Sequence, residues 1–168
     1  MARVLIVAGG CRGRRLAEGL VRDGHAVRIT TRSEAGRAPI EALGAECWIG
    51  TPDRLATLRG SLDGVAVVCW LLGTASGSEE ELLALHGTRL ELFVTQTIDT
   101  TARGFLYEAR GTAANARVLA EGERILLDIS AKNRIPAALL REDPEETEGW
   151  VSAARKAIDG FLLPEAPR

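Results

Sequence analysis

The stretch from Val4 to Arg32 limits the fold of this chain more than any other part of the sequence. It reads VLIVAGGCRGRRLAEGLVRDGHAVRITTR. A short apolar run leads into three glycines, apolar residues then recur at helical spacing, and a second β-prone run follows Gly24. This order predicts a strand, a glycine turn, a helix and a second strand, which together form a βαβ unit. In such a unit the turn lets the backbone approach a pyrophosphate, whose charge lies at the positive end of the helix.

The remainder of the sequence alternates in the same way. We expect strands at 3–8, 26–31, 45–49, 65–72, 104–109 and 135–141, and helices at 13–23, 36–43, 51–62, 78–98, 113–133 and 143–162. This alternation predicts an α/β fold with a doubly wound parallel sheet of the Rossmann type, and right-handed crossovers favour the strand order 3-2-1-4-5-6. We expect a single three-layer domain over residues 1–163 and a loose C-terminal tail over 164–168.

Two of the expected helices rest on local signals at their starts. Residues 51–53 (Thr-Pro-Asp) read as an N-cap, a proline at the first position and an acid in the first turn. They predict a helix with an apolar stripe formed by Leu55, Leu58 and Leu62. Ser78 and Glu81 form a capping box for the helix over 78–98. Gly87 is the residue at which this helix could be interrupted.

Composition and charge exclude several classes of function. The formal net charge is −2, which gives no reason to expect nucleic acid as a partner. No apolar run approaches the roughly 20 residues that span a bilayer, and the chain enters a strand at once, so we expect a cytoplasmic protein without a membrane partner. No residues have the spacing of a metal site. We expect His25 and His86 at the surface, and Cys47 and Cys69 as buried thiols.

The glycine turn is the first candidate binding site. The strict dinucleotide fingerprint is G-x-G-x-x-G, and here Ala8 stands at its first glycine while Gly10 and Gly13 match the other two. We expect the pyrophosphate of a dinucleotide to be held by Gly9, Gly10, Cys11, Arg12 and Gly13. The alternative is a Rossmann domain whose binding site has decayed.

The end of the second strand bears on the choice of cofactor. NAD enzymes carry an acid there that binds the ribose hydroxyls, whereas this chain has Arg32. Arginine suits a 2′-phosphate because it donates two parallel hydrogen bonds, so we expect NADP, with NAD less favoured. The alternative reading of Arg32 is a solvated surface charge. Gly73 and Thr74, after the fourth strand, are expected near the ribose on the nicotinamide side.

Taken together, these segments resemble the extended short-chain dehydrogenase/reductases, among them the NAD-dependent epimerase/dehydratase and NmrA-like proteins. The opening stretch, LDGVAVVCWLL, RGFLYEARG and IPAALLRE are similar to the family's first βαβ unit and its fourth, fifth and sixth strands. The resemblance implies a nicotinamide dinucleotide as cofactor. It also makes the helix over 113–133 a candidate for pairing in a homodimer.

The chain departs from the family's catalytic pattern. Catalytic members carry a serine at the end of the fifth strand and a Tyr-x-x-x-Lys motif, but here that strand ends in Ala109-Arg110 and no lysine stands four residues after Tyr107, the single tyrosine. Tyr107 is expected in the core. Glu108 and Arg110 are expected to pair at the surface, with a role toward a substrate as the alternative.

Two functional hypotheses remain open. The first is a dinucleotide-binding module that acts as a sensor or as a regulatory subunit. The second is a small oxidoreductase that transfers hydride to a flavin, quinone or carbonyl substrate without a tyrosine acid.

Overall fold

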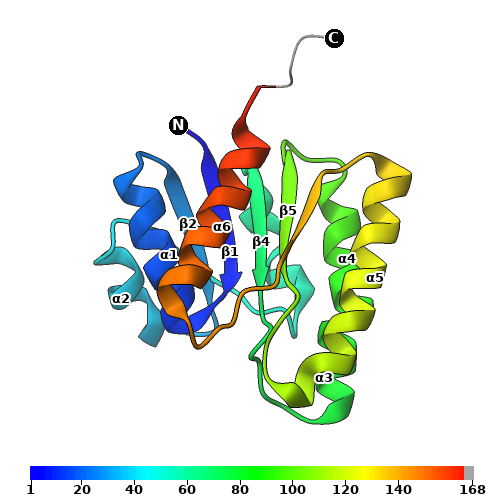
Figure 1. Cartoon of the computed structure of the whole chain (residues 1–168). Coiled ribbons are helices and arrows are strands. Elements are labelled where there is room, and N and C mark those ends of the chain that lie inside the picture. Colours follow the sequence, from blue (N-terminus) through cyan, green and yellow to red (C-terminus); the bar gives the residue numbers. More distant parts are fainter. Residues whose placement is uncertain (165–168) are drawn as a thin grey trace.

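The computed structural model describes residues 1–164 and shows one parallel sheet between two layers of helices (Figure 1). Its strands are β1 (Arg3–Ala8), β2 (Ala26–Thr31), β3 (Glu46–Ile49), β4 (Val67–Leu71), β5 (Gly104–Glu108) and β6 (Ala137–Leu140). All neighbouring strands are parallel and their order is β3-β2-β1-β4-β5-β6. The predicted Rossmann topology is therefore confirmed, while the predicted tail over 164–168 lies almost entirely outside the described residues.

The helices divide between the two faces of the sheet. They are α1 (Gly10–Arg22), α2 (Arg37–Glu41), α3 (Glu79–Leu85), α4 (Thr88–Thr97), α5 (Ala116–Asn133) and α6 (Thr147–Leu162). Side chains of α1, α2 and α6 share one core cluster, and those of α4 and α5 share the other. Figure 1 shows α1 and α6 crossing the sheet on one side and α4 and α5 on the opposite side.

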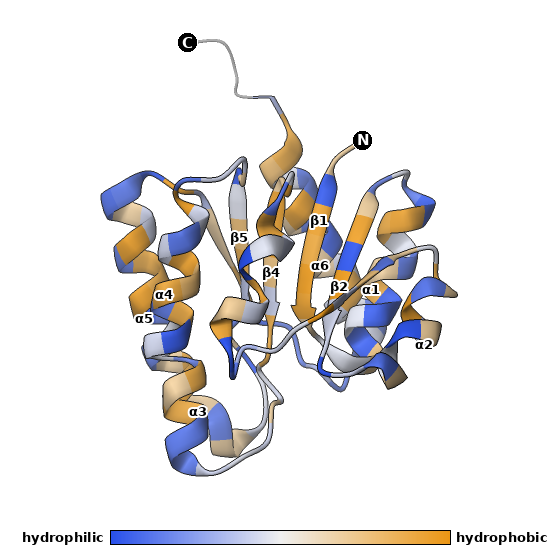
Figure 2. Ribbon diagram, turned by 180° about the vertical axis from the view of Figure 1, so that it is seen from behind, coloured by the Kyte–Doolittle hydropathy of each residue, from blue (hydrophilic) through white to orange (hydrophobic). Residues whose placement is uncertain are grey.

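Alternation along the strands explains why both faces are covered. Ile6 points to the layer of α1 and α6, while its neighbours Leu5 and Val7 point to the layer of α4 and α5. All five residues of β4 are buried, as expected of a central parallel strand covered on both faces. The ribbons coloured by hydropathy show β1 as mainly apolar, and the helices as a mixture of apolar and polar residues (Figure 2).

The strand order defines where a ligand can bind. β1 lies between β2 and β4. The connection that leaves β1 leads to one side of the sheet, and the connection that leaves β4 leads to the other side. In open α/β sheets, ligands bind beyond the carboxyl ends of the strands at this switch point. That edge carries the glycine turn after β1 and the loops that follow β2 to β6.

The helix predicted over 51–62 does not form, and that prediction is wrong. The segment contains two 3₁₀ turns, Leu55–Thr57 and Arg59–Leu62. The Thr57 hydroxyl accepts a hydrogen bond from the Thr51 backbone at 2.9 Å, which closes a tight loop instead of a helix start. Leu58 and Leu62 are nevertheless buried, so the apolar residues were identified correctly although their secondary structure was not.

Two other helices differ from the prediction, one in its middle and one at its start. The helix expected over 78–98 is split into α3 and α4 because Gly87 leaves the helical conformation, at φ −115° and ψ −105°. The capping box of Ser78 and Glu81 at the start of α3 is confirmed. The last helix begins at Thr147 and not at Asp143, whose carboxylate instead accepts the backbone N–H of Glu145 at 3.0 Å. Within residues 1–164, no helix has the length and apolar character needed to cross a membrane.

Candidate functional site

The glycine turn brings the backbone to the centre of the ligand-binding edge. Ala8, Gly9 and Gly10 have φ values of 62°, 94° and 54°, a left-handed run that favours glycine. A Cβ at Gly9 would lie 2.9 Å from the Cα of Gly13, so the turn and the start of α1 are packed backbone against backbone. A Cβ at Gly10 would meet nothing within 4 Å, so open space lies beside the helix N-terminus. This is the geometry in which an anion can reach the free N–H groups of a helix.

A cavity of about 340 Å³ opens beside this turn, over the ends of β2 and β3. Its walls come from the loop after β3 and from α3 and α4, and its lining includes Thr30, Arg32, Asp53, Leu85 and Arg89. Thr30 is held in place because its hydroxyl accepts the backbone N–H of Ala8 at 3.1 Å. The cavity therefore joins the glycine turn to apolar and charged side chains.

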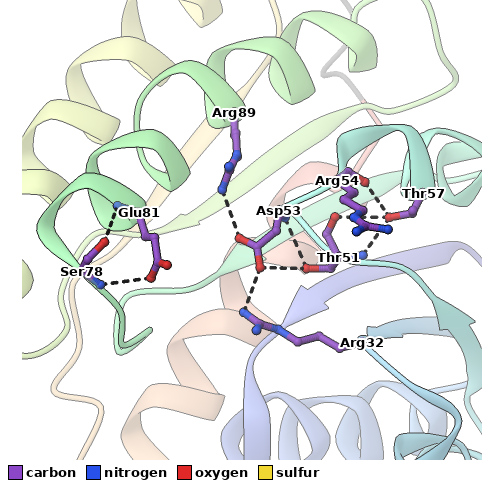
Figure 3. A network of polar contacts seen from close by, with 8 residues as sticks. All are labelled: Arg32, Thr51, Asp53, Arg54, Thr57, Ser78, Glu81 and Arg89. Carbon is purple, nitrogen blue, oxygen red and sulfur yellow. Dashed lines mark hydrogen bonds and ion pairs between the residues drawn. The ribbon is translucent and has the colours of Figure 1, made fainter.

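Two arginines on opposite walls of this cavity share one carboxylate (Figure 3). Asp53 contacts Arg32 at 3.3 Å through one oxygen and Arg89 at 3.1 Å through the other. The Arg32 side chain is 77% exposed. Asp53 thus bridges the two guanidinium groups, and a second acid, Glu81, also lines the cavity.

Arg14 lines a further cavity together with Arg32. A smaller cavity of about 210 Å³ is lined by Gly10, Arg14, Thr31, Arg32 and Gly36, among others. A Cβ at Gly36 would lie 2.1 Å from the Thr31 hydroxyl, so only glycine lets the chain approach this closely. Arg14 and Arg32 thus border one concave site next to the glycine turn.

Arg12 extends toward the other half of the sheet edge. Its Nη2 donates to the Thr74 hydroxyl at 2.9 Å, and its guanidinium lies 5.4 Å from the Trp150 ring centroid. Glu108, at the end of β5, is fully buried behind it, and a Glu108 oxygen is 3.6 Å from Arg12. Glu108 also accepts the backbone N–H of Gly73 at 2.6 Å and the indole N–H of Trp150 at 2.7 Å.

The predicted surface pair of Glu108 and Arg110 is therefore wrong. Arg110 contacts Asp143 at 3.4 Å instead. Burial raises the pKa of the Glu108 carboxyl, while Arg12 and the two hydrogen bond donors act in the opposite direction. Since all three partners can only donate, the carboxylate form is the one that satisfies them.

The loops after β4 and β5 are in close contact. Asn115, at the start of α5, donates to the carbonyl oxygens of Gly73 and Ala75, each at 2.9 Å. A Cβ at Gly111 would lie 1.7 Å from the oxygen of Gly73, so no side chain fits between the loops. Beside them is a groove of about 470 Å³ whose lining includes Arg12 and Thr74.

The structure places both Tyr107 and His86 in the core. Tyr107 is buried, as predicted, but the surface position predicted for His86 is wrong, since that residue is 1% exposed. The imidazole Nδ1 lies 2.7 Å from the Tyr107 hydroxyl, and Nε2 lies 3.2 Å from the carbonyl oxygen of Leu72. Burial lowers the pKa of His86 to about 4 and raises that of Tyr107. The histidine is therefore neutral near pH 7. Cys47 and Cys69 are buried thiols, as predicted, while Cys11 is exposed.

The predicted site residues lie at three places along one edge of the sheet. Gly9, Gly10, Cys11 and Gly13 form the turn and the start of α1, Arg32 borders the cavities over β2, and Arg12, Gly73 and Thr74 meet at the ends of β4 and β5. Sequence reasoning missed Arg14, Asp53 and Arg89. The signal for Asp53 was present in the Thr-Pro-Asp run but was assigned to a helix start. Among residues 1–164, no group of three His, Cys, Asp or Glu could hold a metal ion.

Comparison with known proteins agrees with this architecture. No family model matches the chain. Vestitone reductase from alfalfa superimposes with a TM-score of 0.64 at 15% identity, over 84% of this chain and 56% of that protein. A short-chain dehydrogenase/reductase superfamily protein from Agrobacterium tumefaciens with bound NAD gives 0.67 at 16%, over 83% and 48%. The UDP-glucose 4-epimerase of Thermotoga maritima gives 0.68 at 13%, over 83% and 54%. The chain shares the fold of these three proteins.

One curated protein is similar in sequence. It is the 4-hydroxy-2-methyl-3-oxo-4-farnesyl-3,4-dihydroquinoline-1-oxide ketoreductase of Stigmatella aurantiaca, 29% identical over 135 residues. The alignment covers 80% of this chain but 39% of that protein. This chain thus spans about two fifths of the curated relative and about half of the solved structures. The family resemblance inferred from the sequence is confirmed at the level of the fold.

Proposed function

We propose that this chain is an NADP(H)-binding Rossmann module that acts as a dinucleotide sensor or regulatory unit. The observation that carries the proposal is the concave site formed by the glycine turn together with Arg14 and Arg32. The space beside Gly10 suits a pyrophosphate, and the cavity over β2 and β3 suits an adenosine. Bound NAD in the Agrobacterium protein of the same fold supports a ligand of this class.

Charge favours the phosphorylated dinucleotide. The end of β2 offers Arg32 where an acid would serve the ribose hydroxyls of NAD. Arg14 borders the same cavity, and Arg89 adds a third guanidinium through Asp53. A 2′-phosphate placed between Arg14 and Arg32 would accept charge-assisted hydrogen bonds from both.

A sensor role fits the residues at the end of β5. The single tyrosine is buried and its hydroxyl faces His86, so it is not available to a ligand at the sheet edge. A module of this kind binds the dinucleotide and presents the bound state to a partner or to a further part of a longer protein. It would not oxidise simple secondary alcohols.

Calorimetric titration with NADP tests the proposal with a matched pair of variants. Gly10→Val fills the open space next to the helix N-terminus, and Gly24→Val serves as its control. Both glycines have positive φ, 54° and 90°, and a Cβ at either meets nothing within 4 Å. Each variant carries a comparable backbone cost of roughly 1–2 kcal/mol. We expect both to fold and only Gly10→Val to lose NADP binding; equal affinity in the two variants would refute the placement.

The second candidate is a small NADPH-dependent oxidoreductase. The groove beside Arg12 and Thr74, next to the expected nicotinamide position, favours it because a substrate has room there. NADPH oxidation with flavin, quinone or carbonyl acceptors, followed by absorbance, would support this candidate over the sensor.

A further inference from the structure

The groove at the ends of β4, β5 and β6 is chemically distinct from the cavities over β2 and β3. It has a volume of about 470 Å³ and is lined by Arg12, Thr74, residues 111–113 and residues 143–145. One guanidinium and one threonine hydroxyl lie side by side on its surface. The sequence predicts Arg12 at the pyrophosphate and Thr74 near a ribose, but neither prediction uses the two side chains as a pair.

Contacts from three elements hold Arg12 in position. The Trp150 ring of α6 lies under the guanidinium, Thr74 accepts from Nη2, and Glu108 of β5 lies behind it. The side chain is 21% exposed, so the held guanidinium remains accessible from the groove that it lines. Its orientation is therefore fixed before any ligand arrives, which lowers the entropic cost of binding.

Arg12 forms an ion pair with Glu108 but no hydrogen bond to it. The nearest Glu108 oxygen is at 3.6 Å, beyond hydrogen bond distance, and that carboxylate already accepts the N–H groups of Gly73 and Trp150. The buried Nε of Arg12 has no hydrogen bond partner among residues 1–164. A carboxylate in the groove could therefore accept a charge-assisted hydrogen bond from the guanidinium group.

Thr74 adds a second donor. Its oxygen accepts from Arg12, so its own O–H is directed elsewhere and can be donated to a ligand. The acids on the facing wall limit the charge and size of that ligand. Asp143 is paired with Arg110, but Glu145 is exposed at the rim, which disfavours a multiply charged anion.

We infer that this groove is a subsite for a small carboxylate, bound by the Arg12 guanidinium and the Thr74 hydroxyl. The two donors are inferred from the geometry of the groove alone, and only their position beside a nicotinamide rests on the proposed function. If both hold, the molecule that the module senses or reduces next to the dinucleotide carries a carboxylate.

Acetate is a suitable probe, and the arginine Nε–H signals in ¹H–¹⁵N NMR spectra are a suitable readout. Sodium acetate should shift the Arg12 signal saturably, whereas sodium chloride at equal ionic strength should not. Arg12→Gln and Thr74→Val should each weaken acetate binding at least tenfold, as followed by backbone amides of residues 111–113. Thr74→Val leaves the charges intact, so it remains informative if Arg12→Gln is poorly folded. Arg15→Gln, on the same helix but paired with Glu148 outside the groove, is the control.

Repeating the titration with saturating NADP shows whether Arg12 binds a separate carboxylate or the pyrophosphate of the dinucleotide. Acetate binding that persists with NADP present supports a separate carboxylate subsite. Loss of acetate binding on adding NADP would assign Arg12 to the ligand's own pyrophosphate and overturn the inference, as would equal shifts with chloride. If NADP fails to bind at all, the proposed function fails while the acetate result alone still decides the subsite.

Discussion

The cavity over β2 and β3 makes a quantitative prediction about cofactor choice. Arg32 borders the site expected for a 2′-phosphate, and Asp53 competes for it at 3.3 Å. Arg32→Ala should therefore weaken NADP and leave NAD nearly unchanged, whereas Asp53→Asn should strengthen NADP because it frees both Arg32 and Arg89. The two substitutions thus act in opposite directions on the same ligand.

The structure sets the size of both effects. A charge-assisted hydrogen bond contributes about 1.5–3 kcal/mol, which is roughly 10- to 100-fold in affinity. Arg32 is 77% exposed and already shares a carboxylate, so we expect the lower end, about tenfold. An exposed ion pair is worth at most about 1 kcal/mol, so Asp53→Asn should gain no more than about fivefold.

The assay is a set of dissociation constants for NADP and NAD, measured by calorimetry on the wild type and both variants. Raising the salt concentration should shrink the preference for NADP, since exposed charges are screened. Arg59→Ala, which removes an arginine outside both cavities over β2, is the control. If Arg32→Ala weakens both cofactors alike, or if Asp53→Asn weakens NADP, Arg32 does not select the cofactor.

Two further predictions concern stability. The pKa of His86 is lowered to about 4 in the fold, against about 6.5 in the unfolded chain, so the unfolded state takes up the proton first. The contribution of His86 to the free energy of unfolding should be fully present above pH 6.5, and should be lost toward pH 4 by up to about 3 kcal/mol. The raised pKa of Glu108 has the opposite pH dependence, so denaturation curves of the wild type should be compared with those of His86→Gln. The substitution should reduce the dependence of the free energy of unfolding on pH. An unchanged dependence would show that His86 is not its source. Gly111→Ala, whose Cβ would meet the Gly73 oxygen at 1.7 Å, should lose about 1–3 kcal/mol in urea denaturation, whereas Gly149→Ala, with nothing within 4 Å, should lose none.

The sheet was predictable from the sequence because its signals are local. Apolar runs located all six strands, five of them next to a glycine, and crossover handedness then gave their order. The glycine turn was recognisable because Gly9, Gly10 and Gly13 follow a strand directly.

The charged residues of the site were less predictable because their partners are distant in the chain. Glu108 is buried by Trp150, 42 residues away, and Asp53 is held by Arg89, 36 residues away. His86 was placed at the surface because its partner, Tyr107, lies on a strand that only the fold brings close. The failed helix over 51–62 has a local origin instead, since the hydrogen bond from the Thr51 backbone to the Thr57 hydroxyl closes a tight loop where a helix start was predicted.

The crystal structure of the protein soaked with NADP tests the central claim most directly. Electron density for the adenosine should fill the cavity over β2 and β3, with the 2′-phosphate between Arg14 and Arg32 and the pyrophosphate beside Gly10. Density for the dinucleotide elsewhere, or an empty edge at a concentration that saturates calorimetric binding, would contradict the account.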